Sequence, residues 1–293
     1  MVAARLRQLG YLLSRLRRSP VGIAGALIVL IVVGLAVFAP LIMPYDPTEI
    51  HLQDRLMPPA WHEEGRTEYP LGTDQMGRDL LSRIIIGSRV SVMVGVSAVL
   101  VAGTVGVVLG LLAGFVGGWV DSLIMRVVDA LYAIPFILMS MAIVGVLGPS
   151  VWTIVVTLGL VQWQNYSRVI RAEVLSLRER EFVMAARAIG QRELLIALRH
   201  ILPNAVASVI VLATLQVAST IISESALSFL GMGVQPPTVT WGLMLADGRD
   251  YLATAWWLAT FPGLAITITV LGIIFLGDWL RDVLDPHLRG TES

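Results

Sequence analysis

Long uncharged apolar stretches recur along the whole chain and constrain its fold more than any other feature. All but one approach or exceed the roughly 20 residues that a helix needs to cross hydrocarbon. The exception, the fourth, runs into Gln162, Gln164 and Asn165, which must face protein, water or the membrane interface. Backbone polar groups in lipid have to pair within their own segment. We therefore predict an all-α integral membrane protein with about six transmembrane helices, at residues 21–43, 90–116, 123–147, 151–161, 205–230 and 255–276.

The composition agrees with a membrane protein and excludes several kinds of site. The chain is 56% hydrophobic and 14% charged, with a mean hydropathy of +0.78, whereas soluble domains are about 25% charged. Its 21 basic residues balance 21 acidic ones, so net charge gives no argument for a nucleic-acid partner. The absence of Lys and Cys removes disulfides, thiol chemistry and any Lys-dependent phosphate loop. The four His are scattered, and we expect no catalytic site and no metal site.

The positions of the Arg residues predict the orientation. An excess of Arg marks the cytoplasmic side, and a cytoplasmic N-terminus places 15 of the 21 Arg on that side. We expect both termini to be cytoplasmic and the apolar stretch near the N-terminus to be a retained anchor, because it is longer than a signal-peptide core. The predicted division is a cytoplasmic segment 1–20, an anchor 21–43, an extracytoplasmic segment 44–89, a five-helix core 90–276 with a cytoplasmic loop 168–203 and an extracytoplasmic segment 231–254, and a cytoplasmic tail 277–293.

The Arg-rich cytoplasmic loop has the pattern of two short amphipathic helices. Phe182, Ala186 and Ile189 recur at helical spacing, and Gly190 is suited to the turn that ends the first helix. A second short helix is expected over residues 192–200, and Pro203 suits the first turn of the next span. The small side chains at 185 and 186 would leave room for the close approach of a partner.

Several residues of this loop also resemble a known family element, the EAA loop with which permeases of ABC importers dock onto their ATPase subunits. Met184 stands where that family has Glu, and His200 stands where Ile is usual. The residues that the resemblance assigns to ATPase coupling are Glu181, Met184, Ala185, Ala186, Gly190, Leu202 and Pro203.

Two further motifs narrow the resemblance to the peptide and nickel branch of these importers. They are Pro-Leu-Gly-Thr-Asp at 70–74 with Gly-Arg-Asp at 77–79, and Glu-Ser-Ala-Leu-Ser-Phe-Leu-Gly at 224–231 with Gln-Pro-Pro at 235–237. The length and the N-terminal anchor are most similar to the second, C-type permease. The resemblance implies a type I importer permease in the plasma membrane of a prokaryote. Its implied partners are a second homologous permease, two cytoplasmic ATPase subunits that hold ATP and Mg, and an extracytoplasmic substrate-binding protein.

Individual polar residues have alternative interpretations. Glu224 is expected near the external membrane boundary, either in a structural role or lining the pathway. Gln162, Gln164 and Asn165 are candidates for the pathway, with interhelical hydrogen bonding as the alternative. Asp74, Arg78 and Asp79 are expected to form a structural clasp, with contact to the binding protein as the alternative. Arg126 and Asp129 are three residues apart and are expected to pair.

Competing functions remain open at this point. A proton-coupled secondary transporter would need ionisable residues near the membrane midplane, which these stretches largely lack. An intramembrane hydrolase would need a catalytic dyad within the bilayer. The leading hypothesis is an importer permease for dipeptides or oligopeptides, with glutathione-type peptides and nickel chelates as alternatives.

Overall fold

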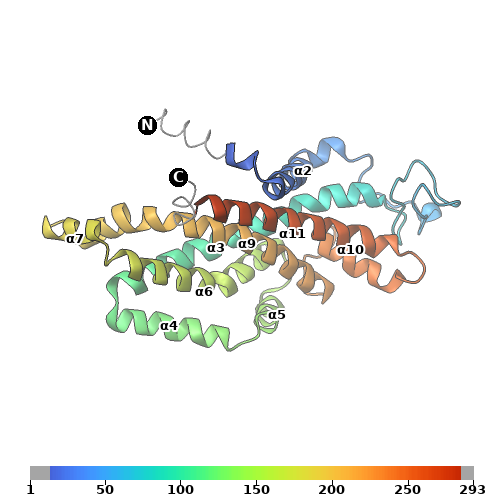
Figure 1. Ribbon diagram of the computed structural model, residues 1–293. Helices are drawn as coiled ribbons and strands as arrows, with labels where there is room; N and C mark the ends of the chain where they lie inside the picture. Colours follow the sequence, from blue (N-terminus) through green and yellow to red (C-terminus); the bar gives the residue numbers. More distant parts are fainter. Residues whose placement is uncertain (1–13, 285–293) are drawn as a thin grey trace.

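The chain forms a bundle of long helices, seen in a computed structural model that describes residues 14–284 (Figure 1). Within that range the one β-type pairing is an isolated bridge between Thr73 and Asp79. In chain order the elements are α2 (Pro20–Ile42), η1 (Leu52–Asp54), α3 (Leu80–Val116), α4 (Gly118–Tyr132), α5 (Phe136–Leu147), α6 (Val151–Leu177), α7 (Glu181–Ala188), α8 (Glu193–Ile196), the π-helical η2 (Ala197–Ile201), α9 (Leu202–Phe229), α10 (Trp241–Gly248), η3 (Arg249–Tyr251) and α11 (Trp257–Leu284).

The long helices are those of an integral membrane protein. Four helices of the described part are long and apolar enough to cross a bilayer, namely α2, α3, α11 and the continuous run of α8, η2 and α9. A bent pair, α4 with α5, provides a fifth crossing if the two are taken together. The helix α6 has 27 residues, which is long enough for a span, but it carries several polar side chains. The predicted all-α membrane fold is confirmed, whereas the count of six spans stays a prediction.

The third predicted span, residues 123–147, is wrong as a single helix. Its two halves, α4 and α5, meet at an angle of 91°. Pro135 caps α5 in an extended conformation, with ψ of 123°. Proline lacks a backbone N–H and disfavours helical geometry in the residue before it, so the helix breaks there. The hydropathy of this stretch predicted its total apolar length but could not predict its bend.

Two predicted boundaries fall inside helices. The second span was expected to start at residue 90, and α3, the helix that contains it, begins earlier, at Leu80. Asp79 caps this helix, since its carboxylate accepts a hydrogen bond from the backbone N–H of Ser82 at 2.7 Å. At the other end of the chain, α11 continues to Leu284, so the tail predicted from residue 277 begins inside a helix. Residues 1–13 and 285–293 lie outside the described part.

Helices α3 and α6 pack closely along their length because glycines line their contact. A Cβ atom on Gly106 would lie 2.3 Å from the carbonyl oxygen of Trp163, and one on Gly110 would lie 2.6 Å from that of Ser167. Both distances are shorter than any tolerated contact. Small residues at four-residue spacing let membrane helices approach closely, and the gain is in packing between the backbones. This contact fixes α6, the helix with most of the candidate pathway residues.

The N-terminal helix α2 lies against α3 and α11 at the side of the bundle (Figure 1). Ser19 begins it as the N-cap, with its hydroxyl accepting from the N–H of Gly22 at 3.1 Å. Its remaining surface exposes large apolar side chains such as Leu30 and Leu41. In a membrane protein such a surface suits contact with lipid.

Candidate functional site

A polar cavity lies where α6 meets α9 and the bend between α4 and α5. Its volume is about 310 Å³. The lining includes Gln162, Gln164 and Asn165 of α6, together with Gln216 and Ser219 of α9. The structure thus brings three of the predicted pathway residues to one cavity, which we call the amide cavity.

A chain of hydrogen bonds crosses the amide cavity from helix to helix. The hydroxyl of Tyr132 donates to Asn165 Oδ1 at 2.5 Å, and Asn165 Nδ2 donates to Gln216 Oε1 at 3.5 Å. Gln216 Nε2 in turn donates to Gln162 Oε1. The side chains of α4, α6 and α9 are therefore linked through carboxamides. Sequence analysis missed Gln216, although a lone carboxamide in the apolar stretch 205–230 was an available signal.

Two carboxamide atoms at this cavity have unused hydrogen-bonding capacity. Gln162 and Gln164 are both buried, and within the described residues neither Gln162 Nε2 nor Gln164 Oε1 has a hydrogen-bond partner. A buried polar atom without a partner costs roughly 1–3 kcal/mol. The amide cavity therefore has buried polar atoms at positions where a purely structural contact would have apolar side chains.

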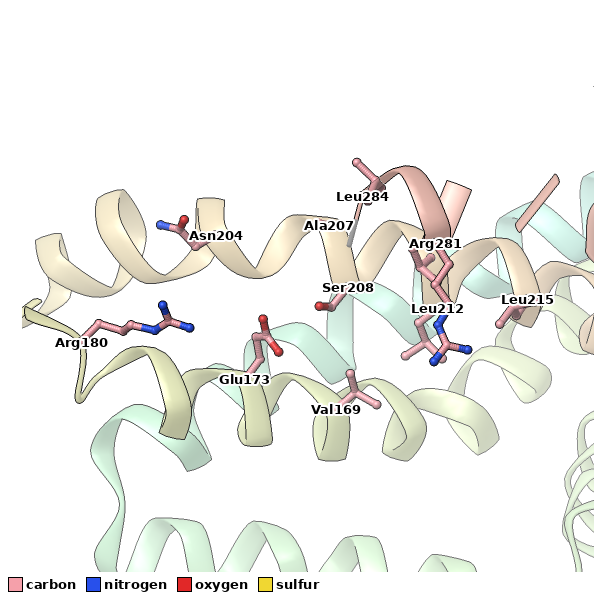
Figure 2. A pocket seen from close by; sticks show the side chains of 11 residues that line it. Val169, Glu173, Arg180, Asn204, Ala207, Ser208, Leu212, Leu215, Arg281 and Leu284 are labelled. Atoms are coloured by element: carbon pink, nitrogen blue, oxygen red, sulfur yellow. The ribbon is translucent and has the colours of Figure 1, made fainter. Parts of the chain in front are cut away.

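A second hollow, the inner groove, is lined by the same pair of helices as the amide cavity. Its volume is about 580 Å³, and it is bordered by α6, α9 and the end of α11. Figure 2 shows the side chains of Glu173, Arg180 and Arg281 around it. The groove lies at the end of the bundle that carries α7, which the Arg distribution predicts to be cytoplasmic.

Glu224 lies elsewhere, outside the lining of the amide cavity. It is fully buried near the end of α9, and its Oε1 accepts a hydrogen bond from the hydroxyl of Ser228 at 2.8 Å. Its other carboxylate oxygen has no hydrogen-bond partner among the described residues. This position favours the structural interpretation of Glu224 over a place in the pathway.

The motif at 70–79 folds into a buried cluster, which we call the Asp74 clasp (Asp74, Arg78, Asp79 and Arg83). Arg78 Nε lies 2.6 Å from Asp74 Oδ2, and Arg83 Nε lies 3.4 Å from the same oxygen. Asp79 is buried as the cap of α3 and accepts from Ser82 Oγ at 2.6 Å. These contacts favour the structural interpretation of Asp74, Arg78 and Asp79.

Arg83 connects the clasp to α10, a role that sequence analysis did not assign. Its Nη2 lies 3.8 Å from Asp247 Oδ2, and its Nη1 donates to the carbonyl of Pro47 at 3.3 Å. Burial raises the pKa of the Asp247 carboxyl above its usual range, while the charge of Arg83 acts in the opposite direction. Nothing in the sequence predicted that Arg83 is buried, because it was expected in a loop and its partner Asp247 is distant in the sequence.

The segment 178–201 differs from the clasp in that much of its apolar surface is uncovered. Ile189 is 82% exposed and Leu194 is 71% exposed, and Phe182 and Met184 are exposed as well. Ala186 and Val183 instead pack into a core with residues of α6. At Ala186 the room that the small side chain leaves is occupied by α6, and the role of this residue in ATPase coupling stays a prediction. Glu181 and Ala185 remain on the exposed side.

The turn at Gly190 has the conformation that its sequence predicted. Its φ is +79°, and a Cβ atom there would meet nothing within 4 Å. Arg187 and Glu193 pair across this turn at 2.9 Å. The prediction of a separate helix over residues 192–200 is wrong, because α8 and η2 run without a break into α9. Leu202 and Pro203 are the first residues of α9 and directly follow the π-helical η2, so Pro203 lies within this continuous run.

One predicted ion pair is formed by a different partner. Asp129 pairs with Arg168 of α6 instead of Arg126, since Arg168 Nη2 lies 2.6 Å from Asp129 Oδ1. The guanidinium of Arg168 also lies 4.4 Å from the ring centroid of Tyr132. A second pair, Arg171 with Asp121 at 2.5 Å, joins the same two helices nearer the start of α4. These contacts position α4 beside the amide cavity.

Comparison with known proteins identifies the family. Residues 106–290 match the binding-protein-dependent transport system inner membrane component, and residues 8–59 match the N-terminal TM domain of oligopeptide transport permease C. The chain belongs to this permease family. It is a C-type ABC permease subunit of the inner membrane, and the family consists of transporter subunits rather than enzymes.

Curated relatives match this permease over nearly their whole length. The di/tripeptide transport system permease protein DppC of Pseudomonas aeruginosa is 45% identical, over 92% of this chain and 89% of the relative. The glutathione transport system permease protein GsiD of Escherichia coli is 41% identical, over 94% and 89%. The dipeptide transport system permease protein DppC of Alkalihalophilus pseudofirmus is 41% identical, over 94% and 88%.

The polar and charged groups of the described part gather in two hollows. Between residues 14 and 284, no three His, Asp or Glu side chains gather closely enough to hold a metal ion. The polar groups that it does gather are the carboxamides of the amide cavity and the charges of the inner groove. Both suit transient contact with a polar solute.

Proposed function

We propose that this permease forms, with a second homologous permease, the pathway through which an ATP-driven importer moves dipeptides or oligopeptides. The observation that carries the proposal is the amide cavity. Polar side chains at membrane depth need a partner or a wet cavity, and they mark solute pathways. Peptides are favoured as the solute because two of the relatives named above are peptide permeases.

In this proposal Gln162, Gln164 and Asn165 line the pathway and Gln216 holds them together. The chain of hydrogen bonds that runs from Tyr132 through Asn165 and Gln216 to Gln162 joins different helices. These bonds therefore restrict passage in this conformation. Glu224 has a structural role at the end of α9, since it lies outside the cavity and bonds to Ser228.

Energy comes from ATP bound with Mg in two separate cytoplasmic ATPase subunits, and an extracytoplasmic binding protein delivers the peptide. The absence of Lys supports a separate site for ATP, because a phosphate-binding loop needs that residue. The segment 178–201 is the proposed contact with an ATPase. Its exposed apolar side chains form a surface that docking would cover.

Reconstitution tests the proposal directly. The permease pair, the ATPase subunits and the binding protein would be assembled in proteoliposomes, and ATP-driven uptake measured for a panel of di-, tri- and tetrapeptides. We expect uptake of at least one peptide class and none without ATP. Uptake that follows a proton gradient and ignores ATP would contradict the proposal.

Glutathione is the second candidate substrate. A 41% identical relative is a glutathione transport permease, and glutathione is itself a tripeptide. Including glutathione and a nickel chelate in the uptake panel separates these alternatives. Exclusive uptake of either one would replace the general peptide assignment.

A further inference from the structure

The inner groove has the charge pattern of a site for a zwitterion. Within residues 14–284, Glu173, Arg180 and Arg281 take part in no ion pair or side-chain hydrogen bond with one another or with other residues. Arg180 and Arg281 are exposed and Glu173 is half-buried, so all three charges are open to a solute that enters the groove. Here a carboxylate and two guanidinium groups border one groove, and Figure 2 shows Glu173 between the two Arg side chains.

The rest of the lining suits the body of a peptide. Val169, Leu212 and Leu215 provide apolar surface, while Asn204 and Ser208 provide polar groups. Asn204 Nδ2 donates to the carbonyl of His200 at 2.6 Å, which leaves its Oδ1 free to accept an amide N–H. The volume of about 580 Å³ lies within the roughly 300–1,000 Å³ typical of small-molecule sites.

The groove also continues from the amide cavity. Gln162, Asn165, Val169 and Glu173 are spaced by three, four and four residues, so they lie along one face of α6. On α9, Leu215 lines the groove and the next residue, Gln216, lines the cavity. The two hollows therefore follow one another along the seam between α6 and α9, and the carboxamide hydrogen bonds cross the first of them.

We propose that the inner groove is an exit site that binds the free peptide as a zwitterion, with Glu173 pairing the terminal ammonium and Arg281 pairing the terminal carboxylate. This rests on the proposed peptide transport. Arg180 adds a second positive charge at the α7 end of the groove. The site holds the peptide by opposite charges at its two ends and is therefore indifferent to its side chains, provided they are accommodated by the apolar wall.

The test measures binding to the assembled importer in nanodiscs, without nucleotide or binding protein. The ligands are Ala-Leu-Ala, its N-acetyl derivative and its C-terminal amide, titrated by saturation-transfer NMR. Exposed ion pairs are weak, so we expect each blocking group to weaken binding by about two- to fivefold. Glu173→Gln should abolish the discrimination against the acetyl group alone, and Arg281→Gln the discrimination against the amide alone.

Asp282→Asn is the matched control, because this exposed residue neighbours Arg281 but does not line the groove. This variant should still bind free Ala-Leu-Ala more tightly than the acetylated and the amidated peptide. Arg281→Lys should keep part of the preference for the free peptide over the amide. Equal affinity of the wild-type importer for all three ligands would overturn the exit site, as would discrimination that survives in both Gln variants. Uptake of Ala-Leu-Ala by the wild-type importer with ATP and binding protein is measured in parallel. If uptake is seen without discrimination, the exit site alone fails; if no peptide of the uptake panel is transported, the proposed function fails with it.

Discussion

The Asp74 clasp and the segment 178–201 both combine Arg with carboxylates, but they use them in opposite ways. In the clasp the charges are buried and shared between residues distant in sequence, such as Arg83 and Asp247. In the segment the pairs are local and exposed, such as Arg187 with Glu193, and the apolar side chains are uncovered. A buried network fixes one arrangement, whereas a surface with exposed apolar groups is completed by a partner. The comparison suggests a rigid end and a docking end of the same subunit.

The largest expected difference between the two regions is their accessibility across the membrane. The chain has no native Cys, so single Cys residues report on a clean background. In intact cells Glu63→Cys should react with an impermeant thiol reagent, and Ile189→Cys should react only after permeabilisation. Both positions are exposed in the subunit, and the cells should lack the ATPase subunits that would cover Ile189, so burial does not explain a difference. Reaction of Ile189→Cys but not Glu63→Cys in intact cells would reverse the predicted topology.

Removing the shared carboxylate of the clasp should have the largest effect on stability. Asp74→Ala leaves the buried guanidinium of Arg83 without its nearer partner, and breaking a buried pair costs about 3–5 kcal/mol. We expect lower membrane abundance and a lower melting temperature of the purified subunit. Asp250→Ala, which removes an exposed partner of Arg249, is the control and should cost less than about 1 kcal/mol. Equal effects of the two changes would show that the clasp does not stabilise the fold.

A change at Gly190 should affect docking more than folding. A residue with a Cβ at φ of +79° costs roughly 1 kcal/mol, but the space around it is open. Gly190→Glu also adds a negative charge beside Glu193. We expect normal membrane abundance, weaker co-purification of the ATPase subunits and loss of substrate-stimulated ATP hydrolysis.

Gly231→Glu provides the matched control for that prediction. Gly231 also has a φ of +79° and open space around it, but it follows α9 at the opposite end of that helix from the 178–201 segment. Its strain should be equal, and ATPase association should be unchanged. Wild-type association of Gly190→Glu would show that the segment is not the coupling element.

The smallest expected effect is the pH dependence due to Asp247, the partner of Arg83 on α10. Because burial raises the folded-state pKa of Asp247, its contribution to stability is fully present below the ordinary carboxyl pKa and is lost as pH rises through the raised value. Relative to Asp247→Asn, the wild type should therefore lose unfolding free energy as the pH rises above the ordinary range of a carboxyl pKa. Melting curves across this rise in pH measure it, with Asp250→Asn reporting the general effect of removing one charge. A gain of wild-type stability with rising pH would contradict the assignment.

The sequence by itself determined the membrane class, most of the helices, the turn at Gly190 and the family. These follow from local properties: apolar length, turn chemistry and short motifs each act within a few neighbouring residues. It also indicated that Gln162, Gln164 and Asn165 were unusual, since carboxamides are costly in lipid.

Only the tertiary structure decided which groups meet. It turned Ala186 toward α6, paired Asp129 with Arg168, buried Arg83 beside Asp74, and brought Gln216 to Gln162. It also broke the third predicted span into α4 and α5. The packing of Ala186 and the contacts Asp129–Arg168 and Gln216–Gln162 depend on the direction in which a helix faces and on a partner far away in the chain. Neither is contained in the hydropathy of a single stretch. The inner groove likewise exists only because α6, α9 and the end of α11 converge there.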